Sequence, residues 1–135
     1  MRIIDVAAGI IWQEGRFLAA KRASGKMGAG LWEFPGGKLE SGETAAEALQ
    51  RELTEELKIT VKEYRFWQTK SHIYPEYKVN LHFFQVPAFQ GEPRCLPMHS
   101  EIAWLLPKEA LLLPFLPADV EVLQELAAGG SVLKL

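Results

Sequence analysis

The chain has 135 residues, of which 48% are hydrophobic and 24% are charged. This balance is typical of a compact globular domain with a real core, and it excludes a disordered or fibrous chain. The formal net charge is -2, so the protein lacks the basic field that would favour binding to long nucleic acid.

The cysteine content and the amino terminus indicate a cytoplasmic protein. Cys95 is the single cysteine, so neither an internal disulfide nor a cysteine-rich metal site can form. The apolar run at the amino terminus alternates and soon reaches Gln13 and Glu14, which favours a strand over a signal sequence or a membrane span. We expect no membrane partner, and a monomer or a weak dimer.

The first predicted elements are two strands, residues 3–12 and 17–22, joined by the turn QEG. The glycine-rich segment ASGKMGAG follows, and it has neither the spacing of a phosphate-binding P-loop nor that of a dinucleotide-binding turn. Residues 31–34 are predicted as a short strand that leads into the loop PGGKLESGE.

A helix is predicted to begin at Thr44 and to end near Leu57. Thr44 and Glu47 have the spacing of a capping box, in which each side chain binds the other residue's backbone amide. The remaining predicted elements are strands over residues 61–74, 77–89 and 101–106 and a helix over residues 118–128. We therefore expect one α/β domain, residues 1–135, with a mostly non-local sheet.

The predicted helix has an apolar stripe that should pack on the sheet. At about 100° per residue, one face carries Leu49, Leu53 and Leu57, flanked by Ala45 and Ala46. Glu47 and Arg51 fall on the opposite, solvated side and have the i, i+4 spacing of an ion pair.

Glu52, Glu55 and Glu56 form an acidic arc beside this stripe. Like charges at these spacings repel, and Glu56 borders the leucines, so without a counter-ion the arc should lower stability. A divalent cation offsets the repulsion, and carboxylate oxygens suit Mg²⁺ or Mn²⁺, which also bind phosphate oxygens. An ordinary acidic surface is the alternative, because paired glutamates are common on exposed helices.

A longer motif favours the metal site. It consists of Gly37, Glu43, Arg51, Glu52, Leu53, Glu55, Glu56 and Ile59. Their spacing resembles the Nudix box, G-x5-E-x7-R-E-U-x-E-E-x-G-U, in which U is an aliphatic residue. The departure is Lys58, which stands where the family usually has a glycine in a left-handed conformation.

Further segments are similar to MutT-type nucleoside triphosphate pyrophosphohydrolases and to their relatives that act on cytidine triphosphates. They are LWEFPGGKLESGET, LHFFQV, Trp104 and PFLPADVEVL. The resemblance implies a Nudix α/β/α sandwich with a mixed β-sheet. It also implies hydrolysis of nucleoside triphosphates to nucleoside monophosphate and pyrophosphate. The leading expected substrate is 8-oxo-dGTP, whose hydrolysis would sanitise the nucleotide pool. Cytidine triphosphates are the close alternative.

The resemblance further implies the metal ligands and the catalytic residues. The Gly37 carbonyl and the carboxylates of Glu52, Glu55 and Glu56 are expected to bind Mg²⁺ or Mn²⁺. Glu52 is also the expected base, and Glu55 and Arg51 are the other expected catalytic residues.

The resemblance also implies roles for Glu43 and Glu101. Arg51 and Glu43 are expected to brace the loop against the helix. Many relatives have another glutamate where this chain has Met98. Glu101 either replaces it as a metal ligand or is a plain charge at the edge of a strand.

Five residues are candidates for substrate binding, and each has a structural alternative. Lys38 binds phosphate or is solvated, and Arg22 lies near the nucleotide or ends a strand. Phe83 or Phe84 flanks the base or, as the favoured alternative, fills the core. Asp119 stabilises the first turn of the last helix, or accepts hydrogen bonds from a guanine edge or from the N4 amino group of cytosine.

Two other functions stay open at this point. In the first, the chain is a Nudix enzyme for another nucleoside diphosphate derivative. In the second, it is a non-catalytic nucleotide-binding module. The intact motif disfavours the module, because binding alone does not require all three helix glutamates. His72, His82 and His99 lack metal-ligand spacing and are assigned no role.

Overall fold

A computed structural model describes residues 1–129 of the chain. Its elements are β1 (Arg2–Gln13), β2 (Arg16–Arg22), β3 (Trp32–Glu33), β4 (Gly36–Lys38), α1 (Ala45–Leu57), β5 (Thr60–Ile73), β6 (Tyr77–Gln90), β7 (His99–Leu105), α2 (Pro107–Ala110) and α3 (Pro117–Ala127). Every predicted element is present, with bounds that differ by at most two residues. The short elements β4 and α2 were not predicted.

The strands form a mixed sheet in the order β3-β2-β1-β6-β5. β1 runs parallel to β6 and antiparallel to β2 and β4, while β5 and β6 form a long antiparallel hairpin. β7 lies antiparallel to β2. This arrangement confirms the α/β class and the mixed sheet.

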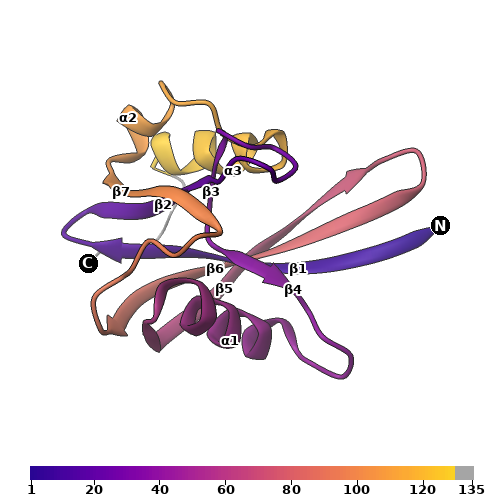
Figure 1. Ribbon diagram of the computed structural model, residues 1–135, viewed down its shortest axis with the longest axis horizontal. Coiled ribbons are helices and arrows are strands. Elements are labelled where there is room, and N and C mark those ends of the chain that lie inside the picture. Colours follow the sequence, from indigo (N-terminus) through magenta and orange to yellow (C-terminus); the bar gives the residue numbers. More distant parts are fainter. Residues whose placement is uncertain (130–135) are drawn as a thin grey trace.

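Helices cover both faces of the sheet (Figure 1). α1 packs on one face, where Leu49, Leu53 and Leu57 are fully buried, as the apolar stripe predicted. α2 and α3 cover the other face, over a core that contains Phe17 and Phe83. Burial of each large apolar side chain contributes about 1.5–3 kcal/mol, so these two cores hold the three layers together.

The ends of α1 are capped as the sequence predicted. The Thr44 hydroxyl accepts a hydrogen bond from the Glu47 amide at 3.1 Å, and the Glu47 carboxylate accepts one from the Thr44 amide at 2.9 Å. The helix ends at Lys58, which has the left-handed dihedral angles φ 60° and ψ 35°. Lys58 thus takes the conformation that glycine has in the Nudix box.

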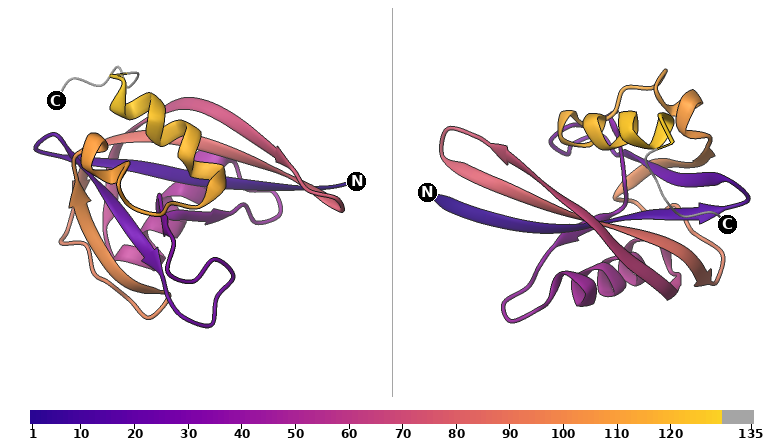
Figure 2. Two further views of the ribbon diagram at one scale, coloured as in Figure 1. Left: turned by 90° about the horizontal axis from the view of Figure 1, so that it is seen from above. Right: turned by 180° about the vertical axis from the view of Figure 1, so that it is seen from behind.

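The hairpin of β5 and β6 extends beyond the helical layers together with the start of β1 (Figure 2). Lys70 on this hairpin reaches α3, where its ammonium lies 3.0 Å from Glu121 and 3.5 Å from Glu125. No helix within residues 1–129 has the length and hydrophobicity to cross a membrane.

Candidate active site

An acidic cleft of about 280 Å³ lies between α1 and the segment from the end of β3 to the start of β4. Its lining residues are Arg22, Lys26, Glu33, Gly36, Glu52, Glu55, Glu56, Met98 and His99. The helix therefore does bring the three glutamates of the arc to one cleft. Glu33 adds a fourth carboxylate from a separate strand.

Arg51 lies within the carboxylate cluster, so the prediction that it pairs with Glu47 on the solvated side was wrong. Its guanidinium contacts Glu43 at 2.7 Å, Glu52 at 2.8 Å and Glu55 at 3.2 Å. Glu47 instead caps the helix. These ion pairs raise the pKa of Arg51 and lower the pKa of Glu43 to about 2.

Arg51 also connects the helix to the preceding loop. It donates a hydrogen bond to the backbone carbonyl of Lys38 at 3.0 Å, and its contact with Glu43 joins the two ends of the loop. These are the contacts expected of a brace between loop and helix. They hold the Gly37 backbone close to Glu52.

Glu56 is buried at the base of the cleft beside the leucine stripe. Burial is the main cause that raises its pKa to about 9, and a hydrogen bond with Glu52 adds to the effect. A carboxyl group in this position stays protonated near neutral pH unless a positive charge approaches it.

The backbone at Gly37 is shaped to the Glu52 carboxylate. A Cβ atom at Gly37 would lie 2.4 Å from the Glu52 carboxyl carbon, so any other residue here would displace the Glu52 carboxylate. The absence of this side chain leaves the Gly37 carbonyl region and Glu52 side by side. Carbonyl and carboxylate oxygens are the ligands that Mg²⁺ and Mn²⁺ prefer, so these residues fit a hard divalent cation.

The glutamates are not yet arranged around one point. Within residues 1–129, no three histidine, cysteine or acidic side chains converge as a preformed metal centre. Arg51 is hydrogen-bonded to Glu52 and Glu55, and Glu56 is hydrogen-bonded to Glu52. Binding of a cation would require small rotations of these side chains.

Two residues of the cleft were not assigned from the sequence. Glu33 on β3 accepts hydrogen bonds from Arg22 at 3.0 Å and lies 3.1 Å from the Nε2 atom of His99. The same Nε2 atom lies 3.6 Å from Glu56. Only the pairing of β2 with both β3 and β7 brings Glu33 and His99 together, and no local spacing indicates it.

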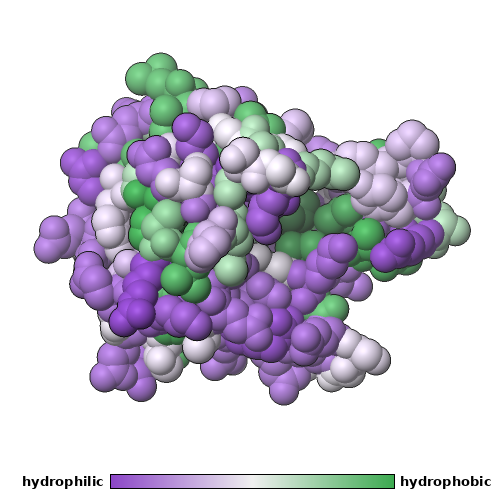
Figure 3. All heavy atoms as spheres, viewed as in Figure 1, coloured by the Kyte–Doolittle hydropathy of each residue, from purple (hydrophilic) through white to green (hydrophobic). Residues whose placement is uncertain are grey.

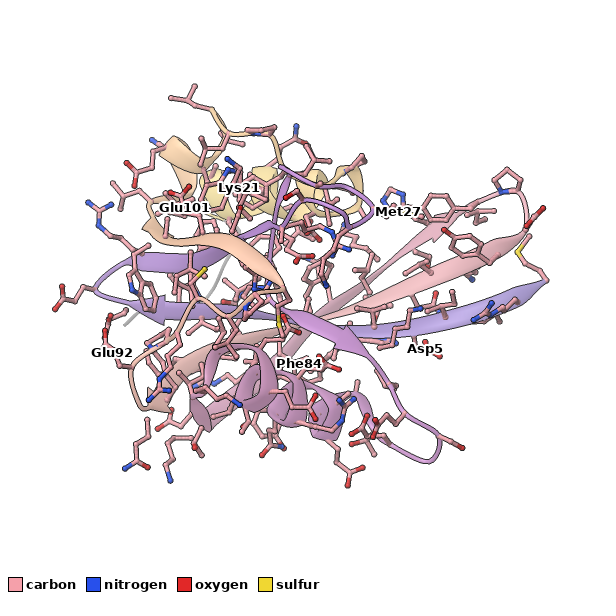
Figure 4. The ribbon with its side chains drawn as sticks, in the orientation of Figure 1. Asp5, Lys21, Met27, Phe84, Glu92 and Glu101 are labelled. Carbon is pink, nitrogen blue, oxygen red and sulfur yellow. The ribbon has the colours of Figure 1, made fainter. Side chains whose placement is uncertain are left out.

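Glu101, a proposed ligand, lies on the other side of the sheet. β7 is irregular where His99 pairs with Arg22 and Glu101 pairs with Lys21, so Ser100 is an extra residue. This bulge turns His99 toward the carboxylates and Glu101 away from them. Figure 4 shows Glu101 beside Lys21 on the side that α2 covers. The structure therefore corrects the expectation that Glu101 joins the metal ligands.

A second, apolar cavity of about 150 Å³ adjoins the acidic cleft, and both are lined by Glu33 and Gly36. Its other lining residues are Val6, Ala7, Ala8, Phe34, Leu81, Leu116, Ala118 and Asp119. In Figure 3 hydrophobic side chains line a hollow between the upper helical layer and the hairpin. The two cavities thus place an apolar surface next to an acidic one.

Asp119 is the buried polar residue of the apolar cavity. It lies in the first turn of α3, and its carboxyl group accepts a hydrogen bond from the Phe34 amide at 3.4 Å. Burial, together with the negative charge of Glu33, raises its pKa to about 8. The sequence predicted only that Asp119 accepts hydrogen bonds from a base, whereas the protonated group also donates one.

The two phenylalanines lie on opposite faces of β6, as strand alternation requires. Phe83 is fully buried and packs edge-on against Phe34, while Phe84 packs against Tyr64 and Phe66 on the α1 side. Figure 4 places Phe84 above α1. Neither lines the two cavities described here, so both fill the core, which was the favoured alternative.

The two basic candidates lie in different places. Arg22 lines the acidic cleft, where its guanidinium donates to Glu33 and to the Met27 carbonyl at 2.7 Å. Lys38 instead lines a separate depression of about 370 Å³ beside Asp5 and Glu40. Lys26, on the glycine-rich segment, is the second basic residue of the acidic cleft.

Comparison with known proteins agrees with this geometry. Residues 6–125 match the model of the NUDIX domain family. The chain belongs to the Nudix family, and it is a hydrolase of MutT-like architecture. MutT-type members of this family generally depend on a divalent metal.

Curated relatives carry two kinds of name. A CTP pyrophosphohydrolase of Escherichia coli K12 is 38% identical over 128 residues, which cover 95% of this chain and 94% of that protein. An 8-oxo-dGTP diphosphatase of Proteus vulgaris is 41% identical over 91 residues, which cover 66% of this chain and 80% of that protein.

Solved structures have the same fold. The solution structure of the ORF135 protein of E. coli superposes with a TM-score of 0.86 at 37% identity, covering 97% of this chain and 93% of that one. A MutT structure from work on Aliivibrio salmonicida and Vibrio cholerae gives a TM-score of 0.81 at 32% identity, covering 95% and 99%.

Proposed function

We propose that this protein hydrolyses nucleoside triphosphates to nucleoside monophosphate and pyrophosphate, with 8-oxo-dGTP as the leading substrate. The observation that carries the proposal is the contact between the two cavities through Glu33 and Gly36. A nucleotide has an apolar base with a polar edge and an anionic phosphate chain. The apolar cavity suits the base, and the acidic cleft suits phosphates accompanied by a cation.

The Gly37 carbonyl and the carboxylates of Glu52, Glu55 and Glu56 would hold Mg²⁺ or Mn²⁺. When bound, such a cation neutralises charge on phosphate oxygens and stabilises the charge that develops during cleavage. Glu101 is not included, because it faces the opposite side of the sheet.

Glu52 is the proposed base. Its carboxylate orients a water molecule and takes its proton while the water oxygen forms a new bond to phosphorus. The bond between the bridging oxygen and that phosphorus breaks, so the α and β phosphates separate. Arg51 holds Glu52 at 2.8 Å and Glu55 at 3.2 Å, and thereby orients both carboxylates.

Asp119 is proposed to read the polar edge of the base. In its protonated form it offers one donor and one acceptor, which match the O6 and N1 positions of a guanine-type edge. The same pair matches N3 and N4 of cytosine. Asp119 alone therefore accommodates both bases, and cytidine triphosphates remain the second candidate, supported by the relative that covers 95% of the chain.

The test is a substrate panel of 8-oxo-dGTP, dGTP, CTP, dCTP and modified cytidine triphosphates with Mg²⁺. We expect equal amounts of nucleoside monophosphate and pyrophosphate, and no product with a chelator. Release of orthophosphate, or faster cleavage of ADP-ribose or a sugar nucleotide, would contradict the proposal. Tight nucleotide binding without any cleavage would instead identify a binding module.

We further propose that residues 1–135 act as one catalytic domain on free cytoplasmic nucleotides, as a monomer or a weak dimer. The net charge of -2 and the acidic cleft support a cation-bound nucleotide over long nucleic acid. Sedimentation of the purified protein and a DNA-binding assay at low salt test these two points.

A further inference from the structure

His99 is buried between the carboxyl groups of Glu33 and Glu56. Its side chain is 2% exposed, and its Nε2 atom lies 3.1 Å from Glu33 and 3.6 Å from Glu56. Glu56 lies only in the acidic cleft, whereas Glu33 lines the cleft and the apolar cavity. One ring nitrogen therefore faces both a proposed metal ligand and a residue that borders the proposed base cavity.

Among residues 1–129, the imidazole has no other side-chain partner. Its Nδ1 atom is buried without a hydrogen-bond partner in this part of the chain, so its polar contacts run through Nε2. Both neighbours of Nε2 are carboxyl groups, and oxygens of a carboxyl group can accept a hydrogen bond in the ionised and in the protonated form. In the tautomer that carries its hydrogen on Nε2, this hydrogen can be donated fully to one carboxyl group at a time.

We propose that His99 is a positioning residue that couples cation binding at Glu56 to the placement of Glu33 beside the base. This inference rests on the metal site and the base cavity proposed above. When Glu56 turns toward a cation, it no longer competes for the Nε2 hydrogen. His99 then donates to Glu33 alone and holds its carboxylate at the border of the two cavities.

The coupling has a defined direction. Cation binding should strengthen the binding of a nucleobase, and by linkage the base should strengthen binding of the cation. The pathway consists of one side chain with two alternative acceptors. Replacement of His99 by leucine removes the donor, while replacement by glutamine keeps an amide donor.

The first experiment measures Mn²⁺ affinity in the wild type, Glu33→Leu, His99→Leu and the double variant. In Glu33→Leu position 33 has no acceptor, so the histidine donor is free to bind Glu56, and Mn²⁺ should bind about 5- to 50-fold more weakly, within the usual range of coupling between sites. In the His99→Leu background the same change should cost less than about twofold. An equal loss in both backgrounds would be a direct charge effect and would overturn the coupling.

The second experiment uses ligands that have no phosphate. Binding of 8-oxo-deoxyguanosine, deoxyguanosine and cytidine is measured by NMR titration with and without Mg²⁺. Because these nucleosides cannot bind a cation through phosphate, a metal effect on their affinity must pass through the protein. The wild type and His99→Gln should show it, and His99→Leu should not.

His72→Leu on the hairpin is the matched control and should behave as the wild type. A metal effect on nucleoside affinity that persists in His99→Leu, or that is missing from the wild type, would overturn the proposal. Hydrolysis of the triphosphate panel by the same preparations separates the two claims. An active wild type with an additive cycle rejects the coupling alone, whereas a wild type that neither binds Mn²⁺ nor cleaves any triphosphate rejects the proposed function and the coupling with it.

Discussion

Glu56 in the acidic cleft and Asp119 in the apolar cavity are both buried carboxyl groups, and burial is the main cause of the raised pKa of each. Their surroundings differ. Glu56 has Glu52 as a hydrogen-bond partner in an open cleft with further carboxylates, whereas Asp119 accepts one hydrogen bond from the Phe34 amide in an apolar cavity. The same perturbation therefore suits two uses.

In the cleft, the clustered carboxyl groups are a site that a cation can complete by displacing a proton. In the apolar cavity, mainly apolar side chains surround Asp119, so Asp119 keeps its proton and acts as a neutral hydrogen-bonding group. The acidic cleft should thus determine the chemistry and the apolar cavity the choice of base. Variants in each should have separable effects.

The largest expected effect is on the chemistry of the cleft. Glu52→Gln removes the proposed base but keeps the size of the side chain, so kcat should fall by about 10²- to 10⁴-fold with the fold retained. The measurement is steady-state hydrolysis, with circular dichroism to verify folding. Glu63→Gln on the exposed part of β5 is the control and should leave kcat unchanged. Near-normal turnover in folded Glu52→Gln would exclude Glu52 as the base.

The second effect is stabilisation by metal. Mg²⁺ or Mn²⁺ at 100 times its dissociation constant should stabilise the fold by about 2.7 kcal/mol. Because Glu56 has a pKa of about 9 without metal and must ionise to bind it, affinity should rise with pH, by about tenfold per unit below 9 if one proton is displaced. Thermal melts across pH 6–9 test this. A melting temperature that metal leaves unchanged would contradict a site on α1.

In the metal-free protein, the stability that Glu56 contributes should change with pH in the opposite direction to the metal affinity. The folded-state pKa of Glu56 lies above its ordinary value of 4.5, so its contribution to stability is present at low pH and is lost as pH rises toward 9. Metal should therefore stabilise the protein most at the alkaline end. Glu56→Gln should weaken the pH dependence of metal affinity and that of metal-free stability. A pH dependence that persists in this variant would show that another group causes it.

The third effect concerns the base. Loss of a matched polar partner costs roughly 1–3 kcal/mol, so Asp119→Ala should lower kcat/KM for the preferred base by about 5- to 100-fold. Poorly used triphosphates should lose much less. A parallel decline for all bases would show that Asp119 only stabilises the first turn of α3.

A pH profile gives a finer test of the same residue. If the protonated form of Asp119 recognises the base, kcat/KM should fall as pH rises through about 8, by about tenfold per unit above that value. Asp119→Asn has a donor and an acceptor at every pH and should lose this limb. A fall at the same pH in Asp119→Asn would assign the titration elsewhere.

The two cavities also differ in how far the sequence predicted them. The helix glutamates, Gly37 and Arg51 lie in one continuous motif, and helical periodicity places Glu52, Glu55 and Glu56 on one arc beside the apolar stripe. The strands other than β4, and α3, were predicted from alternation and periodicity to within two residues. Local patterns were sufficient there because each depends on a single segment.

Residues brought together by distant strands were not predictable in this way. The extra residue Ser100 reverses the faces of His99 and Glu101, and no pattern in the sequence marks that bulge. Arg51 was placed on the solvated side because a helical wheel ignores the preceding loop, which carries Glu43. The raised pKa of Asp119 depends on burial by β1, β3 and β6, which only the assembled fold provides.

The smallest effect concerns Lys58, which follows the last residue of α1. Lys58 is left-handed, with φ 60°, a conformation that costs a non-glycine residue about 1–2 kcal/mol. Lys58→Gly relieves this strain but also gives the unfolded chain more freedom, so we expect a net gain of up to about 1 kcal/mol. Lys58→Ala keeps the strain and serves as the matched control, with no such gain. Denaturant unfolding measures the free energy of unfolding of the three proteins, which we compare with the same dependence on denaturant concentration. A clear loss of stability in Lys58→Gly would show that the lysine side chain contributes more than its backbone conformation costs. Unchanged kcat in both variants would place this effect in the helix cap and outside the acidic cleft.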